Sequence, residues 1–216
     1  MRTLLPALAV LAATTAAAPA PDPLLRQLLA DAKAARPVAF ERTQRIEDDG
    51  KPVATLVDRY DPALAEPWKL VSVDGRAPKP GELADWRRSI KNAVPGYARI
   101  AALIGSAQRV DATHYRVAPL PKGFMARDAF ADHLVAEVTI DTSAARPYVR
   151  EAHFYAREPF RMFVVVKIDK FDGLNRYAPG PGGAPEIVAQ DILIAGSGPG
   201  MSGTQIKRAM FRPLVR

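Results

Sequence analysis

The chain has 216 residues, no cysteine and a formal net charge of +7 at pH 7. The lack of cysteine excludes disulfides, thiolate-held metals and a thiol nucleophile, and we expect a product that is not lipid-anchored. The positive charges are scattered along the chain, which argues against a nucleic acid and leaves an anionic membrane surface or an acidic partner as the more natural counterpart.

Residues 1–18 have the layout of a secretory signal peptide. Arg2 precedes a short apolar run (4–13), and small residues follow. The run is too short and too rich in alanine for a permanent membrane helix, which needs about 20 strongly apolar residues. Cleavage a residue or two before residue 18 is the alternative, because Pro19 is awkward at a new N-terminus. We expect a soluble periplasmic protein with a single domain over 19–216; an ordinary Ala-rich first helix is the other interpretation.

The first expected element of the mature chain is a helix over about 22–35. Asp22 supplies a capping carboxylate, Pro23 follows in the first turn, and leucines recur at helical spacing. The period then changes to two. The stretches 38–47 and 52–61 predict a hairpin, because the Asp-Gly turn between them tolerates the positive φ of tight turns.

Helices are then expected between strands. A third strand over 68–75 precedes a helix whose inner stripe is Leu83, Trp86 and Ile90, and a second short helix covers 97–104. At most two helical turns are expected over 127–134. The remaining expected strands are 108–120, with a turn near 111–113, then 135–142, 147–156, 161–171, 186–196 and about 204–212, with a long Pro/Gly hairpin loop over 177–185. This order predicts an α+β fold, a curved antiparallel sheet of eight or more strands.

A glycine motif near the end of the chain resembles a dinucleotide fingerprint. Gly198, Gly200 and Gly203 fit G-x-G-x-x-G after a predicted strand. A true fingerprint needs a following helix and an acidic residue about 20 positions on, but 13 residues remain and none is acidic. Pro199 also removes a backbone N–H from the loop. We expect the glycines to connect two antiparallel strands.

The polar residues do not predict a catalytic or metal site. The three histidines have no metal-ligand spacing, and G-x-S-x-G is absent. Four polar residues share one face of a predicted strand: Glu151, His153, Tyr155 and Arg157. An acid/base patch is one interpretation. We favour a solvated outer face with ion pairs to Lys167 and Asp169, and we predict no enzyme activity, cofactor or metal.

Two stretches, 162–166 and much of 187–195, are apolar on both faces of their strands. In a one-sheet protein each apolar face must be covered, one by helices and the other by a second layer, a ligand or a partner. Ordinary core packing is the alternative for any single residue. A curved sheet with a helical cover is also a natural cradle for an apolar chain.

Two segments carry a family resemblance. DRYDPALAEPWKLVSVDGRAPKPGELADW (58–86) and EPFRMFVVVKIDKFD (158–172) resemble exported members of the periplasmic lipoprotein-carrier superfamily, the LolA/LolB-like proteins. The resemblance implies a half-open barrel, a helical lid over an apolar cavity, and carriage or sensing of lipid. The lack of cysteine departs from the membrane-anchored acceptor type. Arg42, Arg45 and Arg59 are the candidates for the arginine with which carriers hold the lid.

The resemblance and the apolar patterning together predict a monomeric, non-enzymatic protein that binds a hydrophobic ligand, such as a lipid or a lipoprotein acyl chain. The alternative is an envelope interaction or stress-sensing module with a fully packed sheet. The candidate lining residues are Trp68, Trp86, Phe154, Phe163, Val165 and Ile192.

Overall fold

The structure is a computed structural model that describes residues 22–90, 96–124, 128–162, 165–199 and 201–214. The predicted signal peptide over 1–18 lies outside the described residues. The helices are α1 (Pro23–Ala34), α2 (Pro80–Ile90), α3 (Ile100–Ile104) and α4 (Asp128–Ala131), with the short 3-10 helix η1 (Tyr97–Arg99) before α3. No helix of this described part is both long and apolar enough to cross a membrane.

One antiparallel sheet joins the strands in the order β3-β2-β1-β11-β10-β9-β7-β6-β5-β4, and β8 pairs with β9 at the side of this path. The sheet is not closed, and the expectation of eight or more antiparallel strands is confirmed. The strands are β1 (Phe40–Asp48), β2 (Lys51–Tyr60), β3 (Trp68–Val73), β4 (Gln108–Arg109), β5 (His114–Val117), β6 (Leu134–Asp141), β7 (Tyr148–Ala156), β8 (Phe160–Met162), β9 (Val166–Pro179), β10 (Pro185–Gly198) and β11 (Met201–Pro213).

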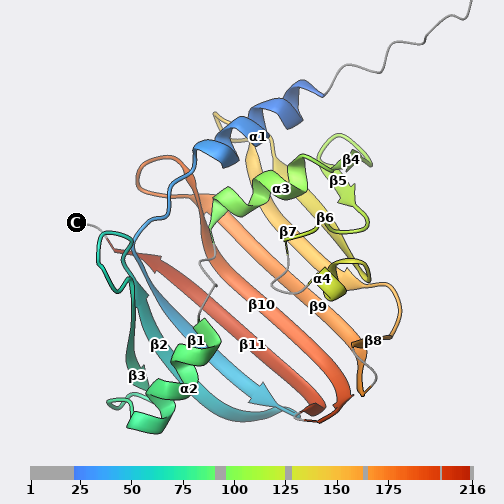
Figure 1. Cartoon of the computed structure of the whole chain (residues 1–216). Helices are drawn as coiled ribbons and strands as arrows, with labels where there is room; N and C mark the ends of the chain where they lie inside the picture. Colours follow the sequence, from blue (N-terminus) through green and yellow to red (C-terminus); the bar gives the residue numbers. More distant parts are fainter. Residues whose placement is uncertain (1–21, 91–95, 125–127, 163–164, 200, 215–216) are drawn as a thin grey trace, which may run out of the picture.

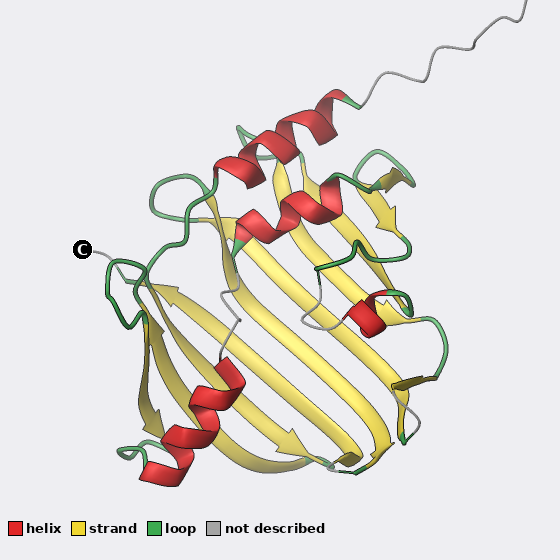
Figure 2. Cartoon of the chain, in the orientation of Figure 1, coloured by secondary structure: helices red, strands yellow, loops and turns green. Residues whose placement is uncertain are grey.

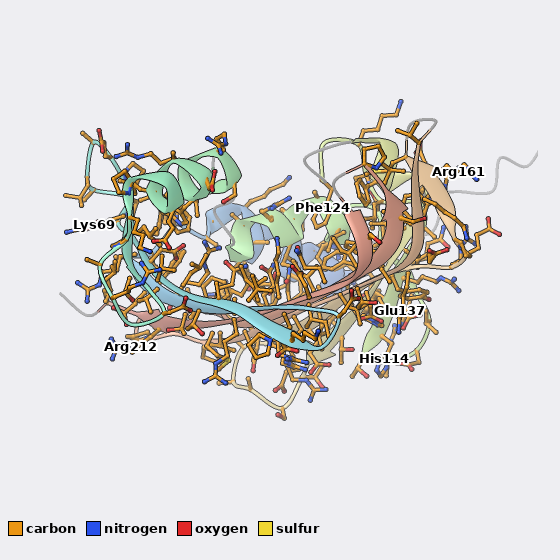
Figure 3. The ribbon with its side chains drawn as sticks, turned by 90° about the horizontal axis from the view of Figure 1, so that it is seen from below. Lys69, His114, Phe124, Glu137, Arg161 and Arg212 are labelled. Atoms are coloured by element: carbon orange, nitrogen blue, oxygen red, sulfur yellow. The ribbon has the colours of Figure 1, made fainter. Side chains whose placement is uncertain are left out.

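The sheet is curved, and the helices lie on its concave side (Figures 1 and 2). Helices α1 and α3 run side by side across one end of the sheet, whereas α2 lies over β1 to β3 at the other side. Figure 3 shows Phe124 on the side of the helices, while His114, Glu137 and Arg212 point away from them. In the described part of the chain, the helices thus cover the concave face of the sheet and leave the convex face open.

The hairpin of β1 and β2 and the helix α1 form where the patterning predicts them. The Asp22 side chain accepts a hydrogen bond from the Leu24 backbone N–H over 2.9 Å, as an N-cap does. The apolar stripe of α1 points into the core, because Leu28 and Ala32 are fully buried. The Asp48-Asp49-Gly50 turn has positive φ at its second and third residues.

The chain departs from the expected pattern at two places. The strand expected over 161–171 is two strands, because β8 ends at Met162 and the chain turns at Val165 before β9 begins. The loop expected over 177–185 is shorter, since β9 and β10 continue to Pro179 and from Pro185. The first difference arises because an apolar run reads as one continuous buried strand. The second arises because the long pairing of β9 with β10 carries residues that favour turns into the strands.

The glycine motif connects two antiparallel strands, β10 and β11, as predicted. Its third glycine is required by a close approach of the β1–β2 turn. A Cβ on Gly203 would lie 2.3 Å from the Asp49 carboxylate, and the φ of this residue is +100°. That carboxylate accepts a hydrogen bond from the Thr204 backbone N–H over 2.7 Å. The glycines thus serve strand packing.

The convex face carries cross-strand ion pairs. Tyr155 donates to Glu137 over 2.8 Å, and His153 lies 3.2 Å from Asp172. Glu151 faces Arg176, with 3.7 Å between the carboxylate and Nε. The outer-face interpretation of this group is therefore correct, but the predicted partners are wrong, because Lys167 and Asp169 pair with each other at 2.6 Å.

Candidate functional site

The concave face is packed at both ends by separate groups of buried side chains. The larger group, which we call the main core, lies under α1 and α3 and reaches across the sheet to Phe40 on β1 and Phe211 on β11; it includes Leu28 and Tyr115. The smaller group, the α2 cluster, consists of four buried residues: Leu70, Val73, Trp86 and Ile90. Between these groups, several side chains on the concave face of the sheet are only partly buried.

The α2 cluster contains a buried polar link between helix and sheet. The Trp86 Nε1–H donates to the Asp58 Oδ2 over 3.0 Å, which joins α2 to β2. Asp58 is 1% exposed and is the pairing partner of Arg42 on β1. The Arg42 guanidinium donates through Nε over 3.0 Å and through its terminal amine over 2.6 Å. A buried carboxylate needs such charge-assisted donors, so these three side chains must stay together.

Arg42 also contacts an aromatic ring beside the α2 cluster. Its guanidinium carbon lies 5.1 Å from the centre of the Trp68 ring, a cation–π distance. Of the three early-strand arginines, Arg42 alone is buried on the concave side. Arg45 is exposed, and Arg59 is exposed and pairs with Glu41 on the outer face.

Between the main core and the α2 cluster, the register of the strands defines a partly buried strip on the concave face, the central strip. Lys207 on β11 is paired with Ile46 on β1 and with Ile192 on β10. Two residues further along β11, Ala209 is paired with Gln44 and Gln190. The central strip consists of Gln44, Ile46, Leu56, Gln190, Ile192, Ile194, Gln205 and Lys207, all partly buried.

The structure brings some predicted lining residues together. Trp86 is buried in the α2 cluster, and Trp68 packs against both this cluster and the main core, with its ring edge-on to Phe40 and tilted against Tyr60. Ile192 lies in the central strip and packs against the edge of the main core. The two tryptophans therefore lie on the α2 side of the strip, and Ile192 lies within it on the side of the main core.

The other predicted lining residues lie elsewhere. Phe154 is buried in the main core, with its ring 5.4 Å from that of Phe124. Val165 is 58% exposed in the turn between β8 and β9, at the side of the sheet. Phe163 falls outside the described residues. The ring of Phe124, which lies in the segment before α4, covers Phe154, and the strand pattern did not reveal this contact.

Cavities flank α1 at its two ends. One of about 560 Å³ lies by the C-terminal end of the helix and is lined by residues that include Ala34, Ala35, Tyr148 and Pro179. Another of about 370 Å³ lies by its N-terminal half, next to Leu25, Leu29 and Ile104. The helix itself sits on filled core, because Leu28 and Ala32 are 0% exposed.

Two tyrosines lock the helices of the main core to the sheet. The Tyr97 hydroxyl accepts from the Val149 backbone N–H over 2.9 Å, and burial raises the pKa of Tyr97 to about 12. Tyr115 donates to Asp22, the N-cap of α1, over 2.8 Å. Burial, followed by the contact with the Asp22 carboxylate, raises the pKa of Tyr115 to about 12. These hydroxyls are hydrogen-bonded structural groups and stay protonated at neutral pH.

Within the described ranges, no group of three or more histidine, aspartate or glutamate side chains is arranged to hold a metal ion. On the concave face of the described strands β1, β2 and β11, the charged side chains are Arg42, Asp58, Lys207 and, at the strip's end, Asp48. Asp58 is occupied by three donors. This arrangement is suited to binding charge and apolar surface rather than to general acid–base transfer.

Comparison of the chain with protein-family models, with curated proteins and with solved structures finds no match.

Sequence reasoning missed Asp58, Lys207 and the glutamines of the central strip. Arg42, Gln44 and Ile46 share one face of β1 because residues two apart in a strand point the same way, and Leu56 and Asp58 likewise share a face of β2. The sequence therefore shows that each strand has one face that mixes polar and apolar residues. Choosing which of the two faces points inward requires the strand order. Lys207 faces the concave side because β11 pairs with β1, a contact between residues about 160 positions apart in the chain.

Proposed function

We propose that the protein binds a hydrophobic ligand, such as a lipid or an acyl chain, on the central strip of its concave face. The partly buried isoleucines between two packed groups carry this proposal: Ile46, Ile192 and Ile194. An acyl chain laid along them gains about 0.8 kcal/mol for each methylene that it buries. In this proposal the sheet is a half-open barrel, and α2 with Trp86 acts as part of a lid beside the ligand.

The proposal extends to the setting of the protein. A signal peptide over 1–18 would place it in the periplasm as a soluble, non-enzymatic monomer, and a resemblance to the LolA/LolB-like superfamily supports an acyl chain as the ligand. Arg42 is the candidate for the arginine that secures the lid, because it is buried and indirectly contacts α2 through Asp58. The basic net charge favours approach to an anionic membrane surface.

A second candidate function is an envelope interaction or stress-sensing module. The tight packing under α1 favours it, since Leu28, Ala32 and Leu103 are all 0% exposed and leave no room for a guest there. The two candidates differ in what they require of the central strip. A carrier needs the strip to accept a chain, whereas the module needs only the folded surface.

Displacement of a fluorescent fatty-acid probe from the purified protein tests the proposal. Saturable binding that tightens about fourfold with each added methylene of the competitor supports a buried acyl chain. Ile192→Gln should weaken binding about tenfold, because it places an amide on the strip. Ile206→Gln is the matched control on the next strand, since Ile206 lies on the opposite face of β11 from Lys207. Equal loss in both variants, or no saturable binding, would overturn the proposal.

A further inference from the structure

A single cation interrupts an otherwise apolar row that crosses the concave face. Directly paired residues on successive strands form this row, and its side chains share one face of the sheet. From β2 to β5 the row consists of Ala54, Ile46, Lys207, Ile192, Gly173, Phe154, Ala136 and Val117. Lys207 is thus the one charged residue among these eight, with an isoleucine on each side.

The neighbouring row places polar groups around this lysine. Gln44 and Gln190 flank the small Ala209, so both are diagonal neighbours of Lys207, which puts them at about 7 Å in an antiparallel sheet. The Gln190 side chain donates to Asn175 over 2.9 Å, which fixes its amide in place. The middle of the concave face therefore has a polar centre beside apolar side chains, the layout that an amphiphile requires.

The acidic groups near Lys207 do not neutralise it fully. Asp58 is bound by Arg42 and Trp86. Asp48 is exposed at the end of β1 and accepts from Gln205 over 3.0 Å. Among the ion pairs between described residues, Lys207 takes part in none. Burial lowers the pKa of Lys207; the charge of Asp48 opposes this shift and that of Arg42 adds to it.

A partly buried ammonium between two isoleucines has lost part of its hydration, and an anion placed against it restores the lost electrostatic stabilisation. We infer that the ligand of the concave face is an amphiphile with an anionic head group, a carboxylate or a phosphate, whose head binds Lys207 while its chain lies along Ile192 and Ile194. This inference rests on the proposed function and specifies the chemistry of its ligand. Gln44 is placed to donate to the same head group.

Four amphiphiles with the same twelve-carbon chain test the inference on the purified full chain at pH 7: dodecanoate, dodecyl phosphate, dodecanol and dodecyltrimethylammonium. We expect both anions to bind at least tenfold more tightly than dodecanol, and the cation to bind more weakly than dodecanol. A preference for the phosphate over the carboxylate points to a phospholipid-like head, and the reverse points to a free fatty acid.

Variants of the lysine separate this inference from the proposed function. Lys207→Met should abolish the preference for anions while leaving the affinity for dodecanol unchanged, and Lys207→Arg should retain the preference. Lys69→Met is the matched control, because Lys69 is exposed on β3 at the side of the sheet (Figure 3). Equal binding of dodecanoate and dodecanol, or a preference that persists in Lys207→Met, overturns the inference alone. Failure of all four amphiphiles to bind overturns the proposed function with it.

Discussion

The two helix-covered ends of the concave face are built in different ways. Under α1 and α3, the main core is continuous and apolar, and Leu28, Ile100 and Leu103 are essentially inaccessible to solvent. Under α2, the apolar cluster has only four buried residues, and polar contacts connect the helix to the strands: Trp86 donates to the buried Asp58, and Arg76 beside β3 pairs with Glu82. Buried apolar surface stabilises the end under α1 and α3, whereas a few specific polar contacts stabilise the end under α2.

This difference predicts different stabilities for the two ends. Elements with little buried apolar area open locally at a lower free energy than the core does. Helix α2 has a small apolar stripe, whereas α1 also contacts α3 and η1. We therefore expect α2 to be the part that moves when a ligand enters, while α1 and α3 stay in place.

The largest expected effect is at the ion pair under α2. Asp58→Ala leaves the buried guanidinium of Arg42 without its partner, so we expect the free energy of unfolding to fall by about 3–5 kcal/mol in urea denaturation. Arg59→Ala, the next residue on β2 but on the outer face, should change it by less than about 1 kcal/mol. Similar small losses in both variants would contradict the view that specific polar contacts hold this end.

The next effect concerns the apolar end. Leu28→Ala removes a fully buried side chain from α1 and should cost about 2–5 kcal/mol, with all probes of unfolding shifting together. Ile90→Ala on α2 should cost less globally and should instead increase amide hydrogen exchange within α2 alone. Gln27→Ala is the control on the exposed side of α1. If Ile90→Ala speeds exchange across the whole sheet, the two ends are not independent.

A smaller effect is expected at the N-cap of α1. The hydrogen bond from Tyr115 is the largest cause that lowers the pKa of Asp22, and the Leu24 N–H and Arg109 act in the same direction. A carboxyl with a lowered folded-state pKa contributes stability above its unfolded pKa, near about 3.9, and loses it as the pH falls through the folded-state value.

Asparagine can still cap the helix but carries no charge, so we expect Asp22→Asn to reduce stability by about 0.3–1 kcal/mol at pH 7 and to match the wild type more closely near pH 2. Thermal unfolding at several pH values measures both differences. Asp85→Asn on α2 is a control, because Asp85 is exposed and its pair with Arg88 lies within one helical turn. If the free energies of unfolding of the wild type and Asp22→Asn differ by the same amount at every pH, the Asp22 charge does not stabilise the N-cap.

The sequence predicted most of the elements, because their patterns are local. The alternation of β1 and β2, the Asp-Gly turn and the Asp22-Pro23 cap each decide their structure within a few residues. The break after Met162 was missed since its residues are apolar on both sides, as in a continuous buried strand. The pairing of β8 with β9 determines where this apolar run breaks, and a local pattern does not show that pairing.

The candidate site was predicted only in part, for the same physical reason. Trp86 and Ile192 were found from apolar content and helical or strand spacing. Lys207 and Asp58 were missed, because a charged residue in an alternating strand is assigned to the solvent face unless the strand order shows otherwise. The pairing of β1 with β11 turns Lys207 inward, and no local pattern encodes that pairing.

The smallest expected effect is at Lys207 itself. Burial lowers its folded-state pKa below the usual value of about 10.4, so the folded protein releases this proton before the unfolded chain does. The unfolded chain then binds more protons between the two pKa values, and the free energy of unfolding rises with pH through that window. Of the charged groups that face Lys207, Asp48 opposes the shift and Arg42 adds to it, while β10 presents Ile192 and Ile194.

Lys207→Met should therefore raise the free energy of unfolding at pH 7 by up to about 1 kcal/mol, and the gain should shrink as the pH approaches 10. Urea denaturation from pH 7 to pH 10 measures this difference, and Lys69→Met should show no such trend, because Lys69 is exposed. If Lys207 destabilises the protein without a ligand, its presence at the polar centre of the concave face is best explained by a role in binding an anion. A loss of stability in Lys207→Met at pH 7 would mean that Asp48 already compensates the lysine, and the concave face would then offer no free positive charge to a ligand.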